Sequence, residues 1–221
     1  ALMKDPRTYE HVEPESVGNA RRVLVSDMAG KSSISEKLKE LGLEISDDST
    51  YITEMIKDME SKGYQFEGAD ASFELLVKRL RGDLEKRFEV SGFRIFMDER
   101  RGLEMDSEAS IKVLDTEGNM EQTAADGNGP VNALDNALRK ALARFYPSLN
   151  NVRLTDYKVR VLDEKSATAA SVRVLMRTTD GESSWTTVGV SENVIEASLI
   201  ALIDSLEYAL MKQDQKTKVN Q

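Results

Sequence analysis

Apolar residues in the first hundred positions follow two different periods. At helical spacing they predict three helices, each followed by a glycine. The helices predicted in this way cover residues 32–41, 49–61 and 69–80. From about residue 87 the period becomes two, as in Phe93, Ile95 and Met97, which would share one side of a strand. We therefore expect a helical segment followed by a β-rich domain.

The second half of the chain contains an internal repeat. Residues 109–114, Ala-Ser-Ile-Lys-Val-Leu, reappear as residues 170–175, Ala-Ser-Val-Arg-Val-Leu. Each copy continues through a glycine turn into a helix, at residues 127–133 and 189–197. Down the two helices the spacing pairs Ala137 with Ala201, Leu138 with Leu202 and Leu142 with Leu206. Each copy therefore predicts three strands and one helix, which covers the apolar face of its sheet.

The predicted fold class is α+β, with a small helical linker subdomain followed by two pseudo-symmetric β-β-β-α units. Residues 1–84 would form the linker and helical subdomain, and residues 85–212 the repeat domain. The closing helices are predicted over residues 131–145 and 194–211. Residues 213–221 are polar and lack an apolar period, which predicts a frayed tail.

Charge and composition exclude several classes of partner and site. The net charge of -9 disfavours nucleic acid and anionic membranes, so small molecules and protein chains are the expected partners. The absence of cysteine excludes zinc–cysteine sites, and a single histidine, His11, excludes a histidine-based metal site within the chain. No apolar run approaches the roughly 20 residues of a membrane span. We expect a cytoplasmic protein.

One loop could bind an anion. Residues 126–130, Asp-Gly-Asn-Gly-Pro, would present backbone N–H groups at a helix N-terminus, although the lysine of a P-loop is missing. The alternative is a tight turn with Pro130 at the first helical position. Because the turn occurs in both copies, two positive helix ends would suit the carboxylate of a small metabolite. By pattern alone Tyr157 and its neighbours Leu154 and Val161 are sheet or core residues, and Tyr9 is a packing tyrosine.

The N-terminal sequence and the repeat together resemble those of a known enzyme family. Residues 8–19, Thr-Tyr-Glu-His-Val-Glu-Pro-Glu-Ser-Val-Gly-Asn, resemble the segment after the catalytic barrel in citramalate synthases and 2-isopropylmalate synthases. The repeat resembles their C-terminal regulatory domain through residues 127–133 and 189–197. In that family a metal-dependent barrel condenses acetyl-CoA with a 2-oxo acid. The resemblance implies that this chain is a fragment without the barrel. Such a fragment would be inactive alone and would bind no cofactor, and the divalent metal would be bound by the missing barrel.

The resemblance also implies individual site residues. Tyr9 matches a linker tyrosine that assists catalysis at the partner subunit's barrel. The positions that match the family's amino-acid effector site are Gly127, Gly129, Val131, Asn132, Leu154, Tyr157, Val161, Thr168 and Val172. Asn132 departs from the acidic residue common at its position, which weakens the expected pairing with the effector's ammonium group.

The sequence of residues 8–19 resembles the citramalate synthases more closely than the 2-isopropylmalate synthases. This implies the regulatory region of an acyltransferase of isoleucine biosynthesis, a homodimer that binds isoleucine as feedback inhibitor. One alternative is the same region of a 2-isopropylmalate synthase, which would bind leucine. Two others are a free-standing amino-acid sensor or dimerisation module and a purely structural dimer domain.

Overall fold

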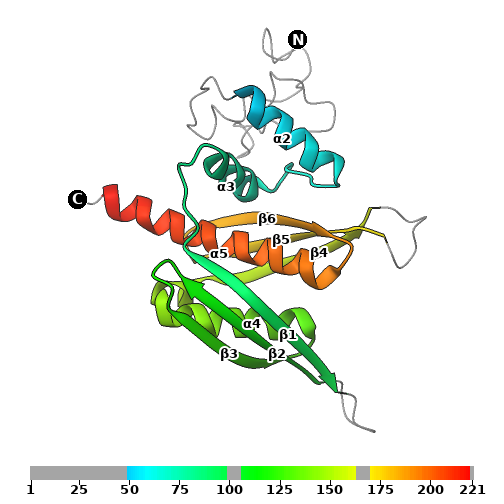
Figure 1. The fold of residues 1–221 in the computed structure, drawn as a ribbon, viewed down its shortest axis with the longest axis vertical. Helices are drawn as coiled ribbons and strands as arrows, with labels where there is room; N and C mark the ends of the chain where they lie inside the picture. Colours follow the sequence, from blue (N-terminus) through cyan, green and yellow to red (C-terminus); the bar gives the residue numbers. More distant parts are fainter. Residues whose placement is uncertain (1–48, 99–105, 163–169, 220–221) are drawn as a thin grey trace, which may run out of the picture.

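Two three-stranded antiparallel sheets and their helices form the body of the molecule (Figure 1). The computed structural model describes residues 49–98, 106–162 and 170–219. Along the chain the elements are α2 (Ser49–Ser61), α3 (Asp70–Leu80), β1 (Phe88–Asp98), β2 (Asp106–Asp115), β3 (Met120–Gly127), α4 (Pro130–Phe145), a 3₁₀ turn (Pro147–Asn151), β4 (Arg153–Val161), β5 (Val172–Thr179), β6 (Ser184–Ser191) and α5 (Val194–Val219). The α+β class and its two β-β-β-α units are confirmed. The helix expected over residues 32–41 lies outside the described residues.

Each sheet is covered by the helix that follows it. The first sheet has the order β1-β2-β3, and Ala109, Ile111 and Val113 of β2 are fully buried on the side of α4. The second has the order β4-β5-β6, and Val174 and Met176 of β5 are buried on the side of α5. The alternation of buried and exposed residues along β2 and β5 is the period-two pattern of a sheet with one covered face.

A pair of equivalent hydrogen bonds shows which residues correspond in the two units. Thr123 of β3 donates its hydroxyl to the Ala137 carbonyl of α4 at 2.8 Å. Thr187 of β6 does the same to the Ala201 carbonyl of α5 at 2.7 Å. The predicted pairing of Ala137 with Ala201 is therefore confirmed, and both helices lie in the same way on their sheets.

The predicted alignment of the two repeats is wrong by four residues at β2 of the first unit and β5 of the second. Ile111 lies opposite Thr123, whereas the residue opposite Thr187 is Met176. Ile111 thus corresponds to Met176 and not to Val172, with which the repeated sequence had aligned it. A shift of four residues keeps every side chain on the same face of the strand, so the apolar alternation could not distinguish the two alignments.

The helical subdomain lies on the outer face of the second sheet, above it in Figure 1. Val188 of β6 is buried there in a cluster with Ile56 of α2 and Phe73 of α3. Ser72 accepts a hydrogen bond from the Val188 N–H at 3.0 Å and donates one to Asp204 of α5 at 2.9 Å. The subdomain is thus fastened both to the sheet and to its covering helix.

Helix α5 continues to Val219, so the predicted end at residue 211 and the frayed tail over 213–221 are wrong as far as the structure describes those residues. The last turns are held by polar contacts with distant parts of the chain. Gln213 accepts a hydrogen bond from Ser148 at 2.5 Å, Asp214 pairs with Arg87, and Lys216 pairs with Glu182 at 2.6 Å. An apolar period is not needed where tertiary ion pairs hold the helix.

Candidate effector site

Four of the expected effector residues share one face of the second sheet. Tyr157 lies opposite Met176, and Val161 lies opposite Val172, so their side chains project toward the α5 side. Leu154 lies opposite the fully buried Thr178 on that same side, beyond a bulge in β4. Val161 is 47% exposed. The four residues form an apolar wall that is open at the end of β4, and this wall is the candidate effector surface.

Tyr157 connects this wall to the start of α5. Its hydroxyl lies 2.9 Å from the Ser198 hydroxyl, which itself donates to the Val194 carbonyl at 2.6 Å. Tyr157 is half-buried, and Ser198 is buried. Sequence reasoning missed Ser198, because a small residue between apolar helix positions carries no signal of such a contact. Any molecule bound against Tyr157 would therefore lie close to the first turns of α5.

Gly127 has a packing role in the structure. It ends β3, and a Cβ atom there would overlap the backbone N of Ala133 and lie 2.7 Å from its Cα. At Gly129, which has the extended φ of 172°, a Cβ would meet nothing within 4 Å. Gly127 thus permits close strand–helix approach. Because Thr123 corresponds to Thr187, the counterpart of Gly127 in the second unit is Ser191 and not Gly189.

The N-termini of α4 and α5 differ, contrary to the expectation of two equivalent anion sites. At α5, the Asn193 side chain accepts a hydrogen bond from the Ile195 N–H at 2.8 Å, and the carboxylate of Glu196 lies in the first turn. At α4, Gly129 precedes Pro130 and provides no side-chain cap. A carboxylate already occupies the first turn of α5, so only α4 keeps a first turn open to an anion.

Beside the open end of α4, Asn132 folds back onto the glycine loop. Its Oδ1 accepts a hydrogen bond from the Asn128 N–H at 3.1 Å. Asn132 is exposed, and Val131 packs against the main core. The glycine loop and the apolar wall belong to different units of the chain. The structure does not describe Thr168 or Tyr9.

A second feature of the two units is an exposed apolar row on each first strand. Phe93 and Met97 of β1 lie opposite Ile111 and Ser107 on the α4 side, yet they are 40% and 54% exposed. Val159 of β4 lies opposite Val174 on the α5 side and is 44% exposed. We call these residues and Val161 the edge-strand apolar surface. Its helix-facing side chains extend beyond the cover that each helix provides.

The described residues contain no group of three or more histidine, cysteine or carboxylate side chains placed to hold a metal ion. No described helix is long and apolar enough to cross a membrane. Among the described carboxyls, burial raises the pKa of Glu207 despite hydrogen bonding from the Arg87 N–H and nearby arginine charges. Glu207 lies where α5 meets the segment that leads into β1, which is a structural position.

Comparison with known proteins assigns the chain to a family. The family model described as the LeuA allosteric (dimerisation) domain matches residues 67–210. The chain belongs to this family. Residues 1–64 match the family described as homocitrate synthase post-HMGL domain-like. The LeuA domain therefore begins ahead of α3, whereas the sequence pattern placed the boundary after residue 84.

Relatives of the LeuA domain chain include named enzymes. An (R)-citramalate synthase of Geobacter sulfurreducens is 54% identical over 220 residues, which cover 97% of this chain and 41% of the relative. One from Aquifex aeolicus is 50% identical, covering 98% and 42%. A 2-isopropylmalate synthase of Methanocaldococcus jannaschii is 29% identical, covering 94% and 39%. The chain spans about two fifths of the length of these relatives, and the predicted family resemblance is confirmed.

Proposed function

We propose that this chain is the C-terminal regulatory region of a citramalate synthase, which forms citramalate from acetyl-CoA and pyruvate. The observation that carries the proposal is the match to (R)-citramalate synthases at 54% and 50% identity over nearly the whole chain. The 29% identity to a 2-isopropylmalate synthase keeps that enzyme, with leucine as its effector, as the second candidate. The acyltransferase chemistry and its divalent metal would belong to a barrel outside this chain, and Tyr9 would assist there.

Isoleucine is the proposed effector of this region. The wall of Leu154, Tyr157, Val161 and Val172 offers an apolar surface for a branched side chain, since all four project from one face of the sheet. The first turn of α4, which has no side-chain cap, offers N–H groups for a carboxylate. An amino acid would use both kinds of contact, so the proposal requires that the two units bring these features to the same ligand.

Dimerisation through the edge-strand apolar surface is the second part of the proposal. Phe93, Met97, Val159 and Val161 are between 40% and 54% exposed although they face the helix side of their sheets. Covering such residues removes apolar area from water at about 25 cal/mol per Å². A second copy would bring the same surface, as a two-fold interface requires. Because Val161 belongs both to this surface and to the apolar wall, effector binding and dimer geometry would be coupled.

An assay of the longer enzyme that contains this region tests the proposal. It should condense acetyl-CoA with pyruvate in preference to 2-oxoisovalerate, and isoleucine should inhibit it more strongly than leucine does. Preference for 2-oxoisovalerate with leucine inhibition would establish the second candidate. Tyr9→Phe should lower turnover without changing inhibition.

A further inference from the structure

We propose that Arg173 is a coupling residue that joins the effector wall to the boundary between the two matched families. The inference rests on the proposed effector function of that wall and extends it to the route by which binding is transmitted. It concerns the end of the second sheet where β4 finishes and β5 begins.

Because side chains alternate along β4 and β5, the residues of the apolar wall and Arg173 project from opposite faces of the sheet. Val161 and Val172 pair across the strands and project toward α5. Arg173, the next residue along β5, pairs with Arg160 and therefore projects from the opposite face. Leu162 directly follows Val161 and its N–H donates to the Ser171 carbonyl at 2.9 Å. Displacement of the Val161–Val172 pair therefore moves Leu162 and Arg173 with it.

Arg173 and Leu162 both contact the turn between α2 and α3. The Arg173 Nε donates to the Gly63 carbonyl at 2.6 Å, and its Nη1 donates to the Gln65 side chain at 2.5 Å. Gly63 has the left-handed φ of +100°, and a Cβ there would overlap Leu162 Cδ1 and lie 3.6 Å from Val190 Cγ1. Two bonds from one planar guanidinium fix the direction as well as the distance of the contact.

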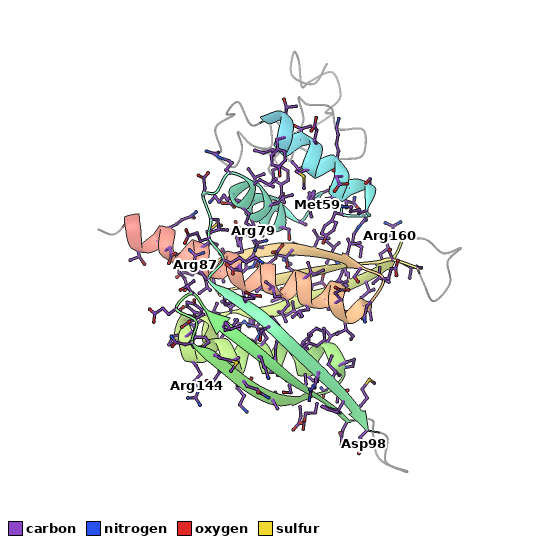
Figure 2. The ribbon with its side chains drawn as sticks, in the orientation of Figure 1. Met59, Arg79, Arg87, Asp98, Arg144 and Arg160 are labelled. Carbon is purple, nitrogen blue, oxygen red and sulfur yellow. The ribbon has the colours of Figure 1, made fainter. Side chains whose placement is uncertain are left out.

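The turn between α2 and α3 lies where the segments matched by the two family models adjoin. One match ends at residue 64 and the other begins at residue 67. Gly63 is the second-last residue of the first match, and Gln65 lies between the two matches. Figure 2 shows the labelled Arg160 at this end of the second sheet, with Met59 of α2 above the sheet. A contact from the wall strand to this turn is placed to carry a change in the LeuA domain into the part that precedes it.

Isoleucine binding would act through this contact if the bound and free states differ in the position of the β4–β5 end. Coupling between two sites requires an element whose arrangement both sites bias, and the proposal gives this role to the Arg173 contact. Removing it should leave the wall able to bind but disconnect the turn from the wall.

The test combines calorimetry with hydrogen–deuterium exchange on this chain, with and without isoleucine. Wild type should bind isoleucine and change its exchange in peptides covering residues 52–66. Arg173→Met should bind with an affinity within about threefold of wild type, yet lose most of the exchange change at the turn. Arg160→Met is the matched control, since it removes the same kind of side chain from the same face of the neighbouring strand. It should behave as wild type.

Each result decides between distinct ideas. If Arg173→Met binds isoleucine and the exchange change at residues 52–66 persists, the coupling role is overturned. If wild type binds isoleucine but shows no change at the turn, it is overturned as well. If wild type binds no branched-chain amino acid, the effector proposal fails, and the coupling proposal falls with it. If Arg173→Met does not fold, Gln65→Met removes only the Nη1 bond and should reduce the remote change in part.

The longer enzyme gives a second readout. Coupling between effector and active sites is typically about 5- to 150-fold in affinity. Arg173→Met should bring the effect of saturating isoleucine on activity close to onefold while basal turnover is unchanged. Full inhibition of the variant at the wild-type isoleucine concentration would contradict the proposal.

Discussion

Replacement of Gly127 by alanine tests whether this glycine serves packing or ligand binding. The glycine ends β3 directly against the first turn of α4. An added Cβ would overlap the backbone N of Ala133 and lie 2.7 Å from both the Ala133 Cα and the Asn132 carbonyl carbon. All three atoms belong to the helix backbone, so no side-chain rotation can relieve the overlap. Strand and helix must separate.

The magnitude follows from that geometry. Ordinary van der Waals contacts begin at 3.4 Å, so each carbon contact is about 0.7 Å too short and the contact with nitrogen is shorter still. Overpacking of this kind costs about 1–3 kcal/mol, and rigid backbone neighbours place Gly127→Ala at about 2–3 kcal/mol. Gly129→Ala is the matched control, two residues away. Its φ of 172° suits any residue and its Cβ would have open space, so its stability should stay within about 1 kcal/mol of wild type.

Urea unfolding followed by circular dichroism, at one fixed protein concentration, measures both effects. With a slope of about 2 kcal/mol per M, Gly127→Ala should lower the midpoint by about 1 M or more, and Gly129→Ala by much less. Equal midpoints for Gly127→Ala and wild type would refute the packing argument. A loss of isoleucine affinity without a loss of stability would instead assign Gly127 to the ligand.

Three further predictions concern other parts of the chain. Thr187→Val loses the 2.7 Å hydrogen bond to the Ala201 carbonyl and should cost about 1 kcal/mol in urea unfolding; an unchanged midpoint would contradict it. Burial raises the pKa of Glu207, so its contribution to stability is present at low pH and is lost as pH rises through that pKa. Glu207→Gln should therefore gain stability relative to wild type as pH rises from about 4 to 8, and a pH-independent difference would argue against this sign. Val159→Asp should raise the dimer dissociation constant at least about tenfold in sedimentation equilibrium, while Lys158→Asp, on the opposite face of β4, should change it little. Equal effects of the two substitutions would remove the edge-strand apolar surface from the interface.

Local periodicity predicted the elements well where one apolar face decided them. Helix α2 spans Ser49–Ser61, as its pattern and the following Gly63 predicted, and α4 begins at Pro130, one residue before the predicted start. The β-β-β-α order of both units followed from alternation and turn residues. These features depend on short-range chemistry that the sequence states directly.

Long-range features could not be predicted in the same way. The repeat was aligned four residues out of register because Val172 and Met176 occupy the same face of β5. The end of α5 was placed too early because Asp214 and Lys216 are held by Arg87 and Glu182 from distant segments. At the candidate site, the apolar wall was predicted by resemblance, whereas its contact with Ser198 and its reverse face at Arg173 depend on tertiary packing.

Isothermal titration calorimetry of this chain with isoleucine, with leucine and valine as competitors, tests the central claim most directly. Wild type should bind isoleucine selectively, and Tyr157→Ala, which removes the ring beside α5, should weaken that binding at least about tenfold. Leucine selectivity would move the assignment to a 2-isopropylmalate synthase. Absence of binding to all three amino acids would contradict an effector site and leave a dimerisation module.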